Sequence, residues 1–160
     1  MKRLPLVLVA VVCVVLAGAA PASAGNHAPA VVDTWISGPS GRAGEGVLSA
    51  NAQGQILNVS ADAPTTIVFD VGANVSGSPA TFRFMGGSGS PDFRVQYLAP
   101  NGADITLAVT GRGYTVRKVP AGGTATIRMV ATIMPSAAGH SGNLAVQAGS
   151  DMVAAFVTAG

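Results

Sequence analysis

The segment Gly139-His140-Ser141-Gly142-Asn143 is where this sequence comes closest to a catalytic pattern. A serine with histidine before it nearly completes the Gly-x-Ser-x-Gly nucleophile motif, but Asn143 stands where the last glycine belongs. That motif also needs a strand that runs into a helix and a histidine later in the chain, and no histidine follows Ser141. We therefore predict a hairpin loop here. A small secreted hydrolase that uses Ser141 and His140 is the alternative.

A second possible site lies near the N-terminus, at Gly25-Asn26-His27. If a protease cleaves the chain after Ala24, a free amine, two amide nitrogens and an imidazole come together at the new terminus. Four nitrogen atoms can surround Cu(II) in the square plane that this ion favours. Copper binding through His27 is therefore an alternative hypothesis, and it depends on the cleavage.

The remaining patterns predict no catalytic, cofactor-binding or metal site. A phosphate-binding loop ends in Gly-Lys-Ser/Thr, but the only lysine after residue 24 is Lys118, between Arg117 and Val119. Paired carboxylates for acid–base catalysis must meet in one cleft, whereas the seven acidic residues are spread along the chain. Turns that need a positive φ explain the abundant glycines more simply. We therefore do not expect an enzyme.

The first 24 residues have the pattern of a cleavable signal peptide. Lys2 and Arg3 precede an apolar run over residues 4–20, and Ala22-Ser23-Ala24 is a small-x-small cleavage site. An uncleaved membrane anchor is the alternative, but the run is slightly short for a span of ~20 residues. The sequence thus predicts a signal helix over 1–24 and a secreted protein, extracellular or associated with the cell wall, with no membrane contact after cleavage.

The composition after residue 24 limits the partners. Seven Lys and Arg residues balance seven Asp and Glu residues, so the formal net charge is zero. Binding to a phosphate backbone needs a basic patch, and nucleic acid is therefore not an expected partner. The only cysteine, Cys13, lies in the signal, so the mature chain has no disulfide and must rely on a hydrophobic core. We expect a flexible leader over 25–30 and a single domain over 31–160.

An alternating pattern over residues 124–134 gives the fold class. Ala125, Ile127, Met129, Ala131 and Ile133 fall on one side of an extended chain, and mostly polar residues fall on the other. Similar short segments are expected at 31–37, 55–60, 65–71, 80–85, 93–97, 105–110, 114–119, 143–148 and 152–158. Turn-rich loops are expected at Gly38–Gly46, Gly72–Pro79 and Gly86–Pro91. This pattern predicts an all-β, antiparallel β-sandwich of about 8–10 short strands.

Several short motifs resemble those of a known family. They are Gly44-Glu-Gly46, Gln53-Gly-Gln55, Phe93-Arg-Val-Gln-Tyr97, Asp104-Ile-Thr106, Thr110-Gly-Arg-Gly-Tyr114, Val119-Pro-Ala-Gly-Gly-Thr124 and Asp151-Met-Val153. In this order they resemble the immunoglobulin-like β-sandwich repeats of secreted bacterial proteins, over about residues 44–158. The resemblance implies an immunoglobulin-like fold and a non-catalytic extracellular module, and it implies no specific ligand.

The sequence therefore predicts a secreted, non-catalytic module with a binding, adhesive or structural role at the bacterial cell surface or outside the cell. Loops at the ends of such a sandwich are the usual places for recognition. The candidate contact surface is the pair of loops Gly38–Gly46 and Gly86–Pro91, with Arg42, Arg94 and Arg112 nearby. The expected partner is a cell-envelope or extracellular protein or glycan, and self-association is a further expectation.

Overall fold

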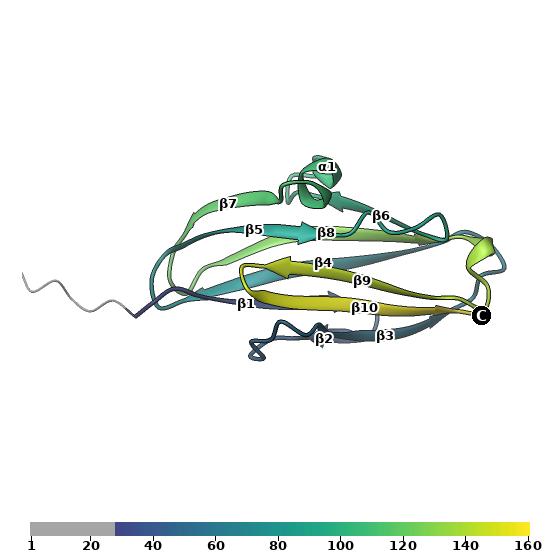
Figure 1. Cartoon of the computed structure of the whole chain (residues 1–160), viewed down its shortest axis with the longest axis horizontal. Coiled ribbons are helices and arrows are strands. Elements are labelled where there is room, and N and C mark those ends of the chain that lie inside the picture. Colours follow the sequence, from purple (N-terminus) through teal and green to yellow (C-terminus); the bar gives the residue numbers. More distant parts are fainter. Residues whose placement is uncertain (1–27) are drawn as a thin grey trace, which may run out of the picture.

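The computed structural model describes residues 28–160, which form ten strands and two short helices (Figure 1). The strands are β1 (Val31–Gly38), β2 (Gly41–Ala43), β3 (Gln53–Val59), β4 (Thr65–Ser76), β5 (Ala80–Gly86), β6 (Phe93–Leu98), β7 (Tyr114–Val119), β8 (Thr124–Ile133), β9 (Ser141–Ala148) and β10 (Asp151–Ala159). The helices are α1 (Thr106–Thr110) and the 3-10 helix η1 (Pro135–Ala137). The predicted signal peptide (1–24) and residues 25–27 of the predicted leader (25–30) lie outside the described residues.

The strands form two five-stranded sheets with a shared core. The first sheet has the order β2-β1-β4-β8-β6, and the second has the order β3-β10-β9-β5-β7. Every pair in the first sheet is antiparallel, whereas β3 pairs with β10 in parallel. The predicted all-β sandwich is confirmed, but its second sheet is mixed rather than antiparallel. The chain visits the other sheet between β3 and β10, so no tight hairpin forces these two strands to be antiparallel.

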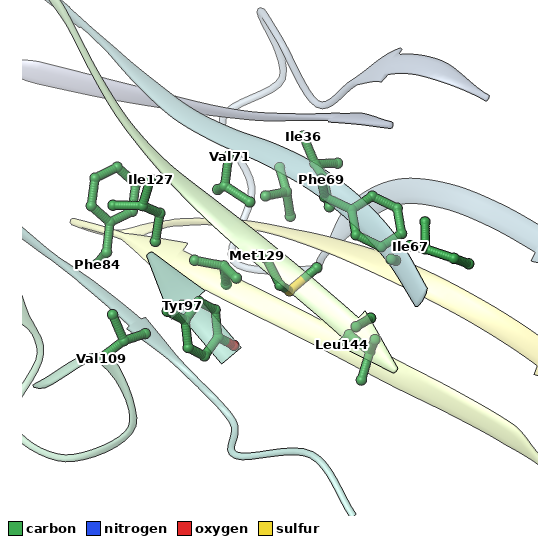
Figure 2. Packing of buried hydrophobic residues seen from close by; sticks show 14 of the residues in the cluster. Ile36, Ile67, Phe69, Val71, Phe84, Tyr97, Val109, Ile127, Met129 and Leu144 are labelled. Carbon is green, nitrogen blue, oxygen red and sulfur yellow. The ribbon is translucent and has the colours of Figure 1, made fainter. Parts of the chain in front are cut away.

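The alternation predicted for β8 is confirmed. Ile127, Met129, Ala131 and Ile133 are buried, whereas Thr124, Thr126 and Arg128 are exposed. Figure 2 shows side chains of β8 packed with Phe69 and Ile67 of the first sheet and with Phe84 and Leu144 of the second. These apolar side chains from the two layers make one continuous cluster, which holds the sheets together.

The strand predicted over 105–110 is wrong, because this segment forms the short helix α1. The Asp104 carboxylate accepts a hydrogen bond from the backbone N–H of Thr106 at 2.8 Å, and this contact starts the helical turn. Val109 is the only buried residue of α1, and Leu107 is 91% exposed. A strand over 105–110 would direct Ile105, Leu107 and Val109 to one face, whereas the helical turn packs Ile105 and Val109 against the core and leaves Leu107 in solvent.

Two predicted loops contain more strand than the sequence indicated. β4 continues to Ser76 through Gly72, where a Cβ would lie 2.2 Å from Cζ2 of the Trp35 ring. Glycine is needed here because the Trp35 indole occupies the space that a side chain would take. Gly72 lies within the strand and forms no turn. The loop expected at Gly38–Gly46 contains β2, which pairs with the end of β1.

The pairing also decides which faces of two ambiguous strands are buried. In β3, Leu57 is buried and Ile56 is 75% exposed. In β10, Val153 and Val157 point into the core, whereas Met152 and Phe156 lie half-buried on the outer face. Within residues 28–160, neither helix has the length and apolarity that crossing a bilayer would require.

Candidate binding groove

A groove lies at the end of the sandwich that also holds η1. It has a volume of about 560 Å³ and is lined by the Gly87–Ser90 loop, by Asp92 and Phe93, and by residues 140–144. We call it the β9 groove, since β9 forms one whole side. It brings together the Gly86–Pro91 loop, which the sequence predicted as a contact surface, and the His140–Ser141 segment, which it singled out for possible chemistry.

The groove exists because β5 is shorter than its neighbour. β9 pairs with β10 over its full length, from Ser141 to Ala148. It pairs with β5 only over Val146–Ala148, because β5 ends at Gly86. Figure 1 shows β5 stopping short of the end of β9 near η1. The chain then leaves the sheet, and its irregular course through Gly87–Ser90 forms the opposite wall.

The floor of the groove is apolar and comes from both sheets. Gly142 lies directly over the Phe93 ring, since a Cβ at Gly142 would stand 2.8 Å from Cγ of that ring. Phe93 and Leu144 are both buried, at 5% exposure each. A larger residue at position 142 would displace the ring, so glycine here lets the two sheets approach closely at the groove.

A polar cluster lies at the end of the groove nearest η1. The Ser136 hydroxyl donates to Asp92 Oδ1 at 2.6 Å, and His140 Nδ1 lies 3.2 Å from Asp92 Oδ2. The contact with Ser136 has the larger effect and the contact with His140 the smaller, and together they hold the pKa of the Asp92 carboxyl below its ordinary value. The His140 side chain is 61% exposed and that of Asp92 is 29% exposed, so both can meet a ligand.

Ser141 does not share in this cluster. Its hydroxyl lies 3.2 Å from Thr158 Oγ1 on β10, which places it on the outer face of the second sheet. Its hydrogen-bond partner is therefore Thr158, and the partner of His140 is Asp92. The sequence reasoning missed Asp92 because a single aspartate beside Pro91 carries no local signature.

The wall opposite β9 is fixed by hydrogen bonds to β6. The Tyr97 hydroxyl donates to the Gly87 carbonyl at 3.0 Å. Ser90 is bound twice to Phe93, through backbone N–H to carbonyl at 2.8 Å and through its hydroxyl, which accepts from Phe93 N–H at 3.1 Å. Burial raises the pKa of Tyr97 to about 12, because an ionised phenolate would lose its hydration.

The structure does not gather the other predicted contact residues at this groove. Arg42 stacks on the Trp35 ring, 3.9 Å from its centroid, and pairs with Glu45 at 3.0 Å. Arg94 lies on β6 opposite Thr132, and Arg112 belongs to the turn between α1 and β7. Arg42 thus fastens the Gly38–Gly46 hairpin over the first sheet, and none of the three arginines lines the β9 groove.

A buried carboxylate that the sequence did not single out holds another long segment. Asp151, at 2% exposure, accepts backbone N–H groups from Thr34 at 2.5 Å and Ser49 at 2.8 Å. It therefore joins β1 and the chain before β3 to the start of β10. Its contacts are with backbone, and its role is structural.

The site contains side chains that bind metals, but in small number. Within residues 28–160, no three His, Cys, Asp or Glu side chains gather around one point. His27, the residue of the copper hypothesis, lies outside the described residues. The sequence matches no protein-family model and no curated protein. The groove itself therefore carries the functional argument.

Proposed function

We infer that this protein is a secreted, non-catalytic binding module that acts at the bacterial cell surface or outside the cell, in an adhesive or structural role. Its ligand is a cell-envelope or extracellular protein or glycan. Three features support the proposal: the signal-peptide pattern of residues 1–24, the resemblance to immunoglobulin-like repeats of secreted proteins, and the two-layer fold.

The β9 groove is the observation that carries the proposal. It combines an apolar floor, formed by Phe93 and Leu144, with polar groups along its rim, among them His140 and Asn143. Ligand sites have this composition, since the apolar part supplies affinity and a few polar groups fix orientation. Its volume of about 560 Å³ falls within the ~300–1,000 Å³ that is usual for such sites.

Two tryptophan variants test the proposal as a matched pair. Gly87→Trp places a large side chain at the groove wall, where a Cβ meets no atom closer than 3.9 Å. Ala121→Trp places the same side chain on an exposed turn at the other end of the sandwich, the turn in which the Gly122 N–H donates to the Val75 carbonyl. The secreted protein and both variants are incubated with cell-wall and culture-medium fractions. We expect capture by the wild type and Ala121→Trp, and loss of capture by Gly87→Trp; equal capture by all three refutes binding through the groove.

The Asp92–His140 contact favours one alternative, a small hydrolase. A carboxylate bound to Nδ1 orients a histidine as a general base, and serines line the same groove. A panel of ester and peptide substrates is assayed with the wild type, His140→Ala and Ser141→Ala. Turnover that both substitutions abolish supports the hydrolase. Equal rates at background in all three remove it.

A further inference from the structure

We propose that the β9 groove binds an extended peptide segment of an extracellular partner protein, and that this segment adds to the second sheet as a strand beside β9. The inference rests on the binding function proposed above and specifies its ligand. In this mode of recognition, main-chain hydrogen bonds supply affinity and alternate side chains supply specificity.

Part of β9 has a free edge beside the groove. On one side, β9 pairs with β10 from Ser141 to Ala148. On the other side, its pairing with β5 stops at Gly86 and Val146. Along the part of the chain that the structure describes, no strand pairs with residues 141–145 on that side. The groove occupies the line along which β5 would have continued.

The backbone groups of Ser141 and Asn143 point toward the groove. The carbonyl oxygen of His140 accepts a hydrogen bond from the Ala159 N–H at 3.0 Å, so residue 140 faces β10. Successive residues of a strand direct their N–H and C=O groups to opposite sides. Ser141 and Asn143 therefore direct both groups away from β10, toward the groove. Unpaired strand groups of this kind are a template for another strand.

The free edge of β9 is walled, unlike the outer edges at β6 and β7. The β6 edge is bridged by Asp104 at Leu98 and by Gly89 at Arg94. The β7 edge carries exposed Arg117 and Lys118, and charges of this kind discourage strand pairing. The free part of β9 lies between β10 and the Gly87–Ser90 loop, and the groove runs along it.

The lining of the groove defines the chemistry of the segment. Side chains that point down meet the apolar floor of Phe93 and Leu144, and side chains that point up lie beside Ser141 and Asn143. A strand that continues the direction of β5, antiparallel to β9, brings its C-terminal end to the Asp92 carboxylate. The expected segment therefore alternates apolar and polar residues and has a basic residue at its C-terminal end.

The test uses a defined probe, the labelled peptide acetyl-Thr-Val-Thr-Val-Thr-Lys-amide, and a matched pair of variants. Asn143→Pro removes the N–H that faces the groove, and proline is tolerated at an unpaired strand edge. Asn143→Thr removes the same amide side chain but keeps the N–H. We expect about tenfold weaker peptide binding for Asn143→Pro and a change of about twofold or less for Asn143→Thr. Thermal unfolding and circular dichroism establish that both variants fold.

The peptide itself supplies a second readout. Two versions of the peptide are made, one N-methylated on its odd-numbered residues and the other on its even-numbered residues. Each version therefore blocks the N–H groups along one edge of the strand. Because a strand uses only one edge to pair with β9, one version should keep its affinity and the other should lose it. Side-chain binding alone would not distinguish the two versions. Equal affinities, or no saturable binding up to about 1 mM, overturn the proposal.

Two other outcomes separate this inference from the proposed function. If fractions are captured through the groove but the captured ligand is a glycan, or if Asn143→Pro changes nothing, the binding function stands and strand addition falls. If sedimentation shows dimers that Asn143→Pro abolishes, a second copy of the chain occupies the edge and the proposal of a separate partner falls. If Gly87→Trp leaves all capture intact, binding through the groove falls, and this inference falls with it.

Discussion

Tyr97 links the core to the wall of the β9 groove, and we expect its ionisation to weaken both. The residue is 1% exposed, and its hydroxyl donates to the Gly87 carbonyl at 3.0 Å. Burial raises the pKa of Tyr97 to about 12 from its ordinary value of 10.0. Once ionised, the phenolate can no longer donate to Gly87, and it places a charge in an apolar core.

The size of the effect follows from that pKa. A change from 10.0 to about 12 corresponds to about 2.7 kcal/mol, at about 1.36 kcal/mol for each pH unit. Because the folded-state pKa is the higher one, this contribution to the free energy of unfolding is complete below pH 10. It is lost as the pH rises through about 12. The stability of the wild type should therefore fall by about 2–3 kcal/mol over this range from Tyr97 alone.

The assay is a titration of tyrosinate absorbance on the wild type and on Tyr97→Phe. The chain has two tyrosines, so the difference between the curves reports Tyr97, while Tyr114 contributes to both. Fluorescence of the single tryptophan, Trp35, follows unfolding in the same samples. A difference curve centred near pH 10 while Trp35 still reports the native state would refute the reasoning. So would an equal loss of stability in Tyr97→Phe over the same pH range.

Three further predictions concern parts of the fold outside the lining of the groove. Asp151→Asn should lower the free energy of unfolding by about 2–4 kcal/mol, because the single oxygen of an amide cannot replace both carboxylate oxygens as acceptors for the Thr34 and Ser49 N–H groups. A change of less than about 0.5 kcal/mol in the free energy of unfolding measured in urea would count against this. Gly72→Ala should displace the Trp35 ring, cost about 1–3 kcal/mol and shift its emission to the red, and an unchanged spectrum would contradict the packing. Hydrogen bonds from Thr106, the larger cause, and from Gln96 lower the pKa of Asp104 to about 2 from its ordinary value of 3.8. The Asp104 carboxylate therefore contributes to stability above pH 3.8, and this contribution is lost as the pH falls through about 2. Asp104→Asn should therefore flatten the acid side of the stability curve, and an unchanged acid slope would exclude that role.

Local patterns in the sequence were enough to predict the architecture of the fold. The alternation of Ile127, Met129 and Ile133 has a period of two, and this period by itself places β8 in a sheet with one buried face. The same holds for Phe82 and Phe84 in β5. Glycine and proline between such segments marked most of the connections, since turn chemistry is also local.

Short-range patterns failed where both choices were locally acceptable. Met152 and Phe156 are as apolar as Val153 and Val157, so only the register with β9 decided which pair enters the core. Gly72 is typical of a turn, but in the folded protein it makes room for the ring of Trp35, which is 37 residues away along the chain. Tertiary packing overrides local preference at such positions.

The sequence alone therefore determined the class of fold, the zero net charge of the chain after residue 24 and the two segments around Gly86–Pro91 and Gly139–Asn143. Only the tertiary structure decided that these segments face each other across one groove and that Asp92, not Ser141, holds His140. The physical reason is that β5 ends at Gly86, opposite Val146, so residues 141–145 of β9 extend past its end. Where a strand ends relative to its neighbour depends on contacts between distant residues, and no local pattern records them.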